Sequence, residues 1–273
     1  CDGDDDCPHG SDELNCDGTP DPSGRRATYG YVNVSRGIQD IRMRYLEALL
    51  DHTNPHTGLR YADDPTLAIL EVQNEDSIFF HAPLNTLAGP EVPLHSAAFR
   101  AEFAAWVKAR YETDEALAAA WGDGLRAGDS VDADELAVFG AWEQKPTGPD
   151  NQTQRARHGD FLRFCADTQI GFWTRRRDAV RALGYQGVTL GTGWKPGGPA
   201  ANAPMVYTGS ALDSIDRHGY FGGFGDTHIA LREFGTGTLM DLSKWHNPGE
   251  ENEWQTPFSR SFLQVEDRPF GMS

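Results

Sequence analysis

Positive charge and long apolar runs are both scarce in this sequence. Its 273 residues carry 41 Asp and Glu against 24 Lys and Arg, a formal net charge of −17 at pH 7. A chain this acidic repels phosphate backbones and anionic lipid surfaces, which argues against nucleic acid and membrane as partners. No apolar run approaches the length of a membrane span, and no signal peptide is visible. The composition favours cations or neutral molecules as ligands.

Cysteine is also rare, and three of the four cysteines fall within the first 16 residues. Residues 1–23 contain eight acidic side chains and no Lys or Arg. A segment this small buries no core of its own and needs disulfides or a metal to be ordered, unless it is a disordered acidic linker. We therefore expect an acidic head with its linker at 1–23 and a larger domain at 24–273. The fourth cysteine, Cys165, lies in a helical pattern, which is typical of a core thiol.

The head, from Cys1 through Cys7 to Cys16, resembles the C-terminal half of a low-density-lipoprotein-receptor class A repeat. The resemblance implies a Cys1–Cys16 disulfide and leaves Cys7 without its partner, because the first half of the repeat is absent. It also implies a Ca²⁺ site, since calcium prefers shells of oxygen ligands. The implied ligands are the carboxylates of Asp2, Asp6, Asp12 and Glu13 and the backbone carbonyl of Asp4. Disulfide chemistry predicts an extracellular, secreted protein, and we expect the encoded protein to begin upstream of this partial motif.

The stretch at 67–77 is the most informative part of the larger domain. It is a short apolar run that ends on Gln73-Asn74-Glu75-Asp76, as expected for a buried strand with a polar end. Side chains alternate across a strand, so Glu71, Gln73 and Glu75 are predicted to share one face. The other face carries Ala68, Leu70 and Val72 and is predicted to pack on helices. The carboxyl ends of such strands are where barrel and doubly wound folds build their sites.

Helical and extended patterns alternate along the rest of the chain. Helical stripes of apolar residues are expected at 38–50, 97–111, 114–121 and 160–183. Ser35 is the expected N-cap of the first of these helices, and Thr113 or Asp114 starts the third. Extended runs are expected at 67–75, 187–191, 211–220 and 268–273, and 78–93 is expected to be a long loop over the site. This alternation predicts an α/β fold with parallel strands.

Asn74-Glu75 at a strand end, followed by Asp216-x-His218-x-Tyr220 on a later strand, resembles a large clan of glycoside hydrolases. This is the (β/α)8-barrel clan that includes cellulases, mannanases, β-galactosidases and agarases. The runs at 103–111 and 117–122 are similar to the helix pair that follows the Asn-Glu strand in β-galactosidase-like members. The resemblance covers about residues 29–273 and implies a partial TIM barrel that holds strands four to seven. It implies hydrolysis of O-glycosidic bonds in a β-linked poly- or oligosaccharide, and hence a carbohydrate partner.

Retaining members of such a clan use two carboxyl groups about 5–5.5 Å apart and need no cofactor for catalysis. The resemblance implies that Glu75 is the acid/base and that Asn74 bonds the sugar's 2-hydroxyl. It also implies that the nucleophile follows the run at 268–273 and lies beyond the end of this chain, so that the chain alone is inactive. Glu71 is either an orienting carboxylate or the partner of a buried arginine.

Other residues are candidates for contacts with the sugar. The resemblance implies that His218 and Tyr220 line the sugar pocket, whereas the residues by themselves fit a hydrogen-bonded core pair. Trp194 follows the strand expected at 187–191 and can stack on a sugar face. His81 follows Glu75 in the expected loop and is either a substrate contact or an ordinary exposed histidine. Three tryptophans, Trp106, Trp121 and Trp173, occur at helical spacing, which predicts core positions and not contacts with the sugar.

Two other interpretations remain open. The missing nucleophile favours a non-catalytic secreted protein that binds calcium and carbohydrate. The unpartnered Cys7 and the missing strands also fit a fragment, or a gene model that joins two unrelated segments near residues 17–28. Half a barrel exposes sheet edges and apolar faces, so we expect the isolated chain to be prone to aggregation.

Overall fold

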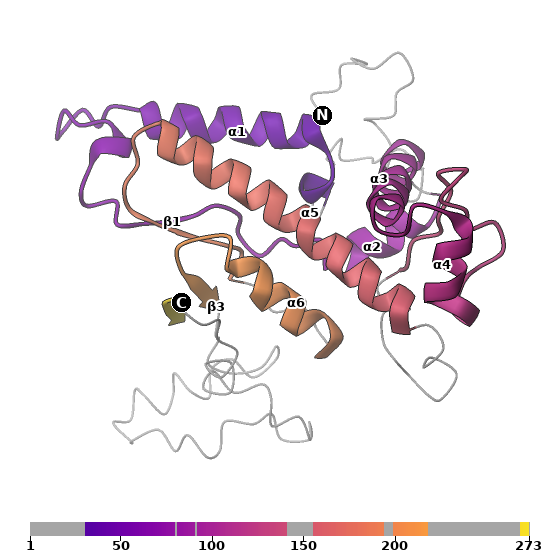
Figure 1. Cartoon of the computed structure of the whole chain (residues 1–273). Helices are drawn as coiled ribbons and strands as arrows, with labels where there is room; N and C mark the ends of the chain where they lie inside the picture. Colours follow the sequence, from indigo (N-terminus) through magenta and orange to yellow (C-terminus); the bar gives the residue numbers. More distant parts are fainter. Residues whose placement is uncertain are drawn as a thin grey trace, which may run out of the picture.

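The computed structural model describes residues 31–79, 81–90, 92–140, 155–193, 199–217 and 268–272. Its longest helix, α5, crosses the centre of the molecule with α1 on one side and α6 on the other (Figure 1). Three-residue 3₁₀ helices lie at Tyr31–Asn33, Tyr61–Asp63 and Gly122–Gly124. Within the described ranges, every helix is too short or too polar to cross a bilayer.

Helix α1 (Arg36–Asp51) follows the local rules of its sequence. The hydroxyl of Ser35 accepts the N–H of Ile38 at 3.5 Å, which confirms the expected N-cap. Leu46 and Leu50 on its inner face are buried. A second apolar stripe on this helix is exposed to solvent and consists of Ile41, Tyr45 and Leu49.

Helices α2 (His81–Ala88), α3 (Pro93–Tyr111) and α4 (Asp114–Trp121) gather around the N-terminal half of α5 (Figure 1). The N-cap Thr113 confirms the expected start of α4, because its hydroxyl accepts the N–H of Ala116. The prediction of a long loop at 78–93 is wrong, since α2 occupies half of it. Leu84 and Leu87 of α2 are fully buried, and this tertiary packing stabilises a helix too short to form alone.

Helices α5 (Arg155–Ala182) and α6 (Pro199–Gly209) complete the helical layer. Aromatic rings from α3 and α5 form the centre of the core, and Phe103 lies 5.2 Å from Phe161 and 5.1 Å from Phe164 between ring centroids. Trp121 and Trp173 are buried and Trp106 packs against the same core, which confirms the predicted core positions. Helix α6 was not expected, because its sequence holds Pro204 and has no clear apolar stripe.

The described strands are short and parallel: β1 (Ile69–Glu71), β2 (Val188–Leu190), β3 (Ile215–Arg217) and β4 (Phe270–Met272). β1 pairs with β2 and β3 pairs with β4, both in parallel register. A single parallel bridge between Leu190 and Ser214 joins the two pairs. The predicted α/β fold with parallel strands is confirmed. The expected end at 75 and the expected start at 211 are wrong, because β1 ends at Glu71 and residues 211–213 form a turn before the bridge at Ser214 and β3. Residues 218–220 of the second prediction lie outside the described ranges.

Helices cover one face of the β1–β2 pair. Leu70 packs against the buried cluster of Leu46, Leu50, Val180 and Tyr185. On the opposite face Ile69 is 56% exposed and its register partner Val188 is 39% exposed. The expected packing of Leu70 on helices is therefore confirmed, and the sheet presents apolar side chains to solvent on its other face.

Candidate functional site

The Asn74–Glu75 turn lies where the ends of β1 and β2 meet. Backbone pairing continues past β1, since the N–H of Val72 donates to the carbonyl of Leu190 at 3.1 Å. It then skips two residues and resumes where the N–H of Glu75 donates to the carbonyl of Thr192 at 2.9 Å. The two residues left out of this ladder, Gln73 and Asn74, form a bend. The turn is thus fixed to the neighbouring strand end on its C-terminal side.

Glu75 has an unusual backbone conformation. Its φ is +40°, in the left-handed region that non-glycine residues seldom adopt. Such residues persist only when surrounding contacts hold them, and they gather at functional sites. The side chain of Glu75 is half-buried, while that of Asn74 is exposed. One turn therefore presents an accessible carboxamide next to a constrained carboxyl group.

The predicted face of Gln73 is wrong. Its side chain is 4% exposed and points toward the helices rather than sharing a face with Glu71. Its carbonyl oxygen accepts from Arg176 of α5 at 3.0 Å and from Arg42 of α1 at 3.4 Å. Its amide nitrogen donates to Asp76 at 3.0 Å. The bend after β1 breaks the two-residue alternation on which the prediction rested.

Buried polar groups anchor the residues that follow the turn. Asp76 and Ser77 are fully buried, and the N–H of Asp76 donates to the hydroxyl of Thr192 at 2.8 Å. The carbonyl oxygen of Gln169 accepts from the hydroxyl of Ser77 at 3.0 Å and from the backbone N–H of Ile78 at 2.9 Å. The amide of Gln169 in turn donates to Thr208 of α6 at 2.8 Å.

The sequence gives little indication of these anchoring residues. The only sequence signal for Gln169 is a polar residue on the otherwise apolar face of α5, and Thr192 and Thr208 carry no signal at all. Gln169 and Thr208 are 39 residues apart in the chain, and Asp76 and Thr192 are 116 residues apart. A side chain's role in such a network depends on the fold and not on local pattern.

Arg176 places positive charge directly behind the turn. It is 6% exposed, and its guanidinium lies 5.5 Å from the ring centroid of Phe172. Burial, with repulsion from Arg42, lowers the pKa of Arg176 to about 10. The group is still protonated at neutral pH, so the turn is backed by a cation.

Of the other expected site residues, some lie within the described ranges and some lie outside them. Glu71 is the last residue of β1 and is half-buried. His81 is the first residue of α2, six positions after Glu75. Several expected residues lie outside the described ranges: Trp194, His218, Tyr220, the five implied calcium ligands Asp2, Asp4, Asp6, Asp12 and Glu13, and Cys1, Cys7 and Cys16. Their roles stay predictions.

Within the described ranges, no three His, Cys, Asp or Glu side chains come together as a metal site. Cys165 is buried as a free thiol, and burial raises its pKa well above the usual value. That environment matches the predicted core thiol, since a reactive cysteine needs a lowered pKa and access.

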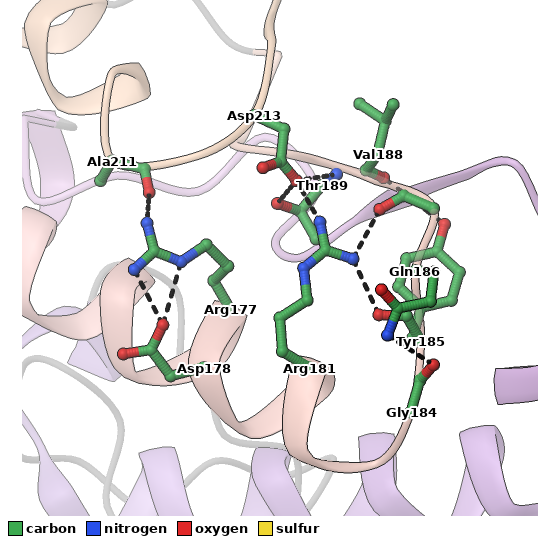
Figure 2. A network of polar contacts seen from close by, with 11 residues as sticks. Arg177, Asp178, Arg181, Gly184, Tyr185, Gln186, Val188, Thr189, Ala211 and Asp213 are labelled. Atoms are coloured by element: carbon green, nitrogen blue, oxygen red, sulfur yellow. Dashed lines mark hydrogen bonds and ion pairs between the residues drawn. The ribbon is translucent and has the colours of Figure 1, made fainter.

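A second polar network lies at the opposite ends of the strands (Figure 2). The carboxylate of Asp213 accepts from Arg181 at 2.6 Å and from the N–H and hydroxyl of Thr189 at 2.8 and 2.6 Å. Arg181 also donates to the carbonyls of Tyr185 and Gly187, each at 2.8 Å. Burial would raise the pKa of Asp213, but the bonds from Thr189 and the charge of Arg181 lower it overall.

This network fixes the entry of β2 and β3, and the same end of the sheet contains an open pocket of about 460 Å³. The pocket is lined by residues 62–65, 67–68 and 184–187, which precede β1 and β2. Its acidic groups already have partners, since Asp63 pairs with Arg60 at 2.8 Å and Asp64 accepts from Thr66 at 2.7 Å. The pocket therefore lies at the end of the sheet opposite the Asn74–Glu75 turn, and its acidic side chains are already engaged.

No protein-family model matches the sequence, and no curated protein matches it. Among solved structures, the chain is similar to one described as "Structural analysis of an exo-beta-agarase", with a TM-score of 0.45 and 18% sequence identity. The match covers 74% of this chain and 25% of that chain. This chain therefore spans about a quarter of the length of that structure, and a likeness so distant says nothing about activity.

Proposed function

We propose that this chain carries the acid/base half of a retaining β-glycoside hydrolase site, built on the Asn74–Glu75 turn. The substrate class is a neutral, β-linked poly- or oligosaccharide, in keeping with a net charge of −17 that disfavours anionic ligands. The proposal includes the interpretation of the parallel strands as a section of a (β/α)8 barrel.

One observation carries the proposal. A glutamate with a φ of +40° sits beside an exposed asparagine at the carboxyl end of a parallel strand. Parallel α/β folds bind ligands at this edge, because the loops there converge while the opposite edge serves stability. The network around Asp213 and the pocket at 62–68 belong to that opposite edge, which supports assigning chemistry to the turn and stability to the network.

Each residue of the turn has a proposed role. Glu75 protonates the oxygen of the leaving sugar and then removes a proton from the water that releases the product. Asn74 donates a hydrogen bond to the 2-hydroxyl of the sugar. The proposal covers only the acid/base half of the reaction, so it assigns no residue as the carboxylate that attacks the anomeric carbon.

Arg176 connects to the turn through Gln73. The guanidinium donates to the carbonyl oxygen of Gln73 at 3.0 Å, and the amide nitrogen of Gln73 donates to the carboxylate of Asp76 at 3.0 Å. These contacts fix the bend that carries Asn74 and Glu75.

The test compares wild type with Asn74→Ala, Glu75→Gln and the control Glu115→Gln, which changes an exposed carboxylate on α4. In the full-length protein, Glu75→Gln should lower turnover of β-linked oligosaccharides by about a hundredfold or more, because it removes the proton donor. Asn74→Ala should weaken both binding and turnover, and Glu115→Gln should change neither. Unchanged turnover in Glu75→Gln would remove Glu75 from the mechanism.

The non-catalytic alternative is separated by the same experiment. Sugar binding that depends on Asn74, without turnover in the full-length protein, would exclude hydrolysis and leave carbohydrate binding. The absence of binding to every β-linked oligosaccharide in a neutral panel would exclude both functions.

The head is proposed to bind Ca²⁺ in a secreted protein. This proposal rests on the sequence motif alone, and it predicts chelator-sensitive calcium binding by the oxidised chain. Asp12→Asn should abolish that binding, while Asp123→Asn, an exposed change in the 3₁₀ helix at Gly122–Gly124, should preserve it. An absence of calcium binding by the oxidised chain would exclude the motif.

A further inference from the structure

Two buried glutamines, Gln39 of α1 and Gln73 of the bend after β1, each accept from one arginine of α1 and one arginine of α5. Gln39 is 5% exposed and Gln73 is 4% exposed. The carbonyl oxygen of Gln39 accepts from Arg175 of α5 at 2.9 Å and from Arg36 of α1 at 3.5 Å. The carbonyl oxygen of Gln73 accepts from the next arginine of α5 and from another arginine of α1, as described above. Gln73 thus joins α1 and α5 through two arginines, whereas Gln39 is part of α1 and, of its two arginines, only Arg175 joins it to α5.

The two glutamines differ in what their amide nitrogens hold. Gln39 donates to the backbone carbonyls of Val32 and Asn33 at 2.8 and 3.3 Å, which fixes the entry to α1. Gln73 donates to the carboxylate of Asp76 at 3.0 Å, across the residues that form the turn. Of these bonds, only the one from Gln73 to Asp76 acts on the candidate site.

The bond from Gln73 to Asp76 closes a loop around the strained residue. Asp76 donates its N–H to the Thr192 hydroxyl, and Glu75 donates its N–H to the Thr192 carbonyl. Gln73 and Asp76 flank the Asn74–Glu75 pair and are therefore held by separate partners. Gln73 is held by arginines of α1 and α5, and Asp76 is held by Thr192, which follows β2. Two such anchors can hold a backbone at a φ of +40° that an unconstrained glutamate would leave.

We propose that Gln73 is a positioning residue for Glu75. It transmits the fixed position of α1 and α5 to the turn and so sets the direction of the Glu75 carboxyl group. This inference rests on the proposed function for its consequence in sugar chemistry, but its structural part stands on the contacts alone. A carboxamide is needed here because it accepts from two arginines and donates to an aspartate at the same time.

The experiment compares Gln73→Met with the matched control Gln39→Met in the full chain. Both changes remove a buried acceptor from two arginines, so both should lower the melting temperature. In Gln73→Met the amide of Glu75 should exchange its hydrogen about tenfold faster than in Gln39→Met, and its ¹H–¹⁵N resonance should shift, because the anchor of the turn is lost. Equal exchange at Glu75 in the two variants would overturn the proposal.

Gln73→Glu provides a second variant that keeps an acceptor for both arginines. A carboxylate cannot donate to Asp76, so the turn should loosen as in Gln73→Met, although the arginines regain a partner. The proposal is supported if Gln73→Glu is more stable than Gln73→Met and the Glu75 amide still exchanges faster than in wild type. Wild-type exchange at Glu75 in Gln73→Glu would contradict it.

Affinity for a β-linked oligosaccharide separates this inference from the proposed function. Gln73→Met should weaken binding by about tenfold, while Gln39→Met should leave it within about twofold, since misplaced groups lose most of their contribution. If wild type binds no sugar, the proposed function fails and the exchange result still decides the positioning role. If wild type binds and the two variants bind equally, the positioning role fails and the function stands.

Discussion

The backbone N–H of Glu75 donates to the carbonyl oxygen of Thr192 at 2.9 Å, which joins the polar turn after β1 to the end of β2. This bond connects residues 117 positions apart in the sequence. It places a glutamate with positive φ at the edge of the sheet where parallel strands end. The conformation of the turn is therefore a property of the fold and not of the local sequence.

Glu75→Gly is expected to stabilise the protein while destroying its proposed activity. A non-glycine residue at this φ costs roughly 1–3 kcal/mol, and the extra freedom of glycine in the unfolded chain offsets part of the gain. The net rise in the free energy of unfolding should be about 0.5–1 kcal/mol, measured by urea titration. Glu112→Gly is the control, because Glu112 also has a positive φ of 66° but caps α3. Glu112→Gly should raise the free energy of unfolding without any effect on sugar binding. A lower free energy of unfolding in Glu75→Gly would contradict the backbone strain at Glu75.

Asp213 should make folding stability depend on pH. Its folded pKa is lowered, so its contribution is fully present above the unfolded value near 3.8 and is lost as the pH falls through the folded pKa. Asp213→Asn should therefore lower stability at pH 7 by about 1 kcal/mol and flatten the decline in stability below about pH 5. Other carboxylates with lowered pKa values add a slope of the same sign, so the difference between variant and wild type isolates Asp213.

Asp178→Asn is the matched control for this pH dependence. Asp178 pairs with Arg177 at 2.8 Å, next to the Asp213 network, but its side chain is 61% exposed (Figure 2). An exposed pair contributes little, so this variant should follow the wild-type curve of stability against pH. A curve for Asp213→Asn that runs parallel to wild type from pH 3 to 7 would contradict the assignment of the lowered pKa.

Arg157 and Asp129 should make strongly coupled contributions to the free energy of unfolding, because they form a buried ion pair. Both side chains are almost fully buried, and Arg157 also donates to the carbonyls of Gly124 and Ala137 at 2.9 and 2.6 Å. Arg157→Met leaves a buried carboxylate without its cation and should cost about 3 kcal/mol. The double variant with Asp129→Asn should lose less than the sum of the single losses, by at least about 1 kcal/mol. Additive losses in a double-mutant cycle would show that the pair is not coupled.

The exposed stripe on α1 should promote self-association. Ile41 and Tyr45 are 60% and 72% exposed, on the side of the helix that faces away from the core. Replacing both by Gln should change the free energy of unfolding by no more than about 0.5 kcal/mol per site, because little apolar area is buried there. Sedimentation velocity should show less association in this variant than in wild type. Leu46→Gln, on the buried face of the same helix, is the control and should unfold the chain. Unchanged association in the double variant of Ile41 and Tyr45 would contradict the role of the stripe.

Local signals in the sequence predicted part of the fold. The caps Ser35 and Thr113 and the stripes of α1, α3, α4 and α5 act within a few residues, so their helices were expected at nearly the observed bounds. The short helices α2 and α6 were missed, because their stability comes from packing rather than from propensity. Strand positions were found but their lengths were not, since the bend after β1 depends on contacts with Arg176 and Thr192.

Of the residues in the candidate site, only Asn74 and Glu75 were predicted from the sequence. Asn74 and Glu75 were expected together at the end of a strand, whereas they lie in a bend that follows β1, and their roles stay predictions. Gln73 was expected on the wrong face, because alternation assumes an extended strand and the chain bends there. Thr192 and Gln169 could not be expected, since their partners come from distant segments and their residue types are common in ordinary loops and helices.

The most direct test of the central claim is an NMR-detected titration of the ¹⁵N-labelled chain with neutral β-linked oligosaccharides. We predict that the backbone resonances of Asn74, Glu75 and Thr192 shift as one site saturates, and that Asn74→Ala raises the sugar concentration needed for these shifts without unfolding the protein. Shifts confined to other parts of the chain, or shifts at the turn that saturate in Asn74→Ala at the same sugar concentration as in wild type, would contradict the assignment of the Asn74–Glu75 turn as the sugar site.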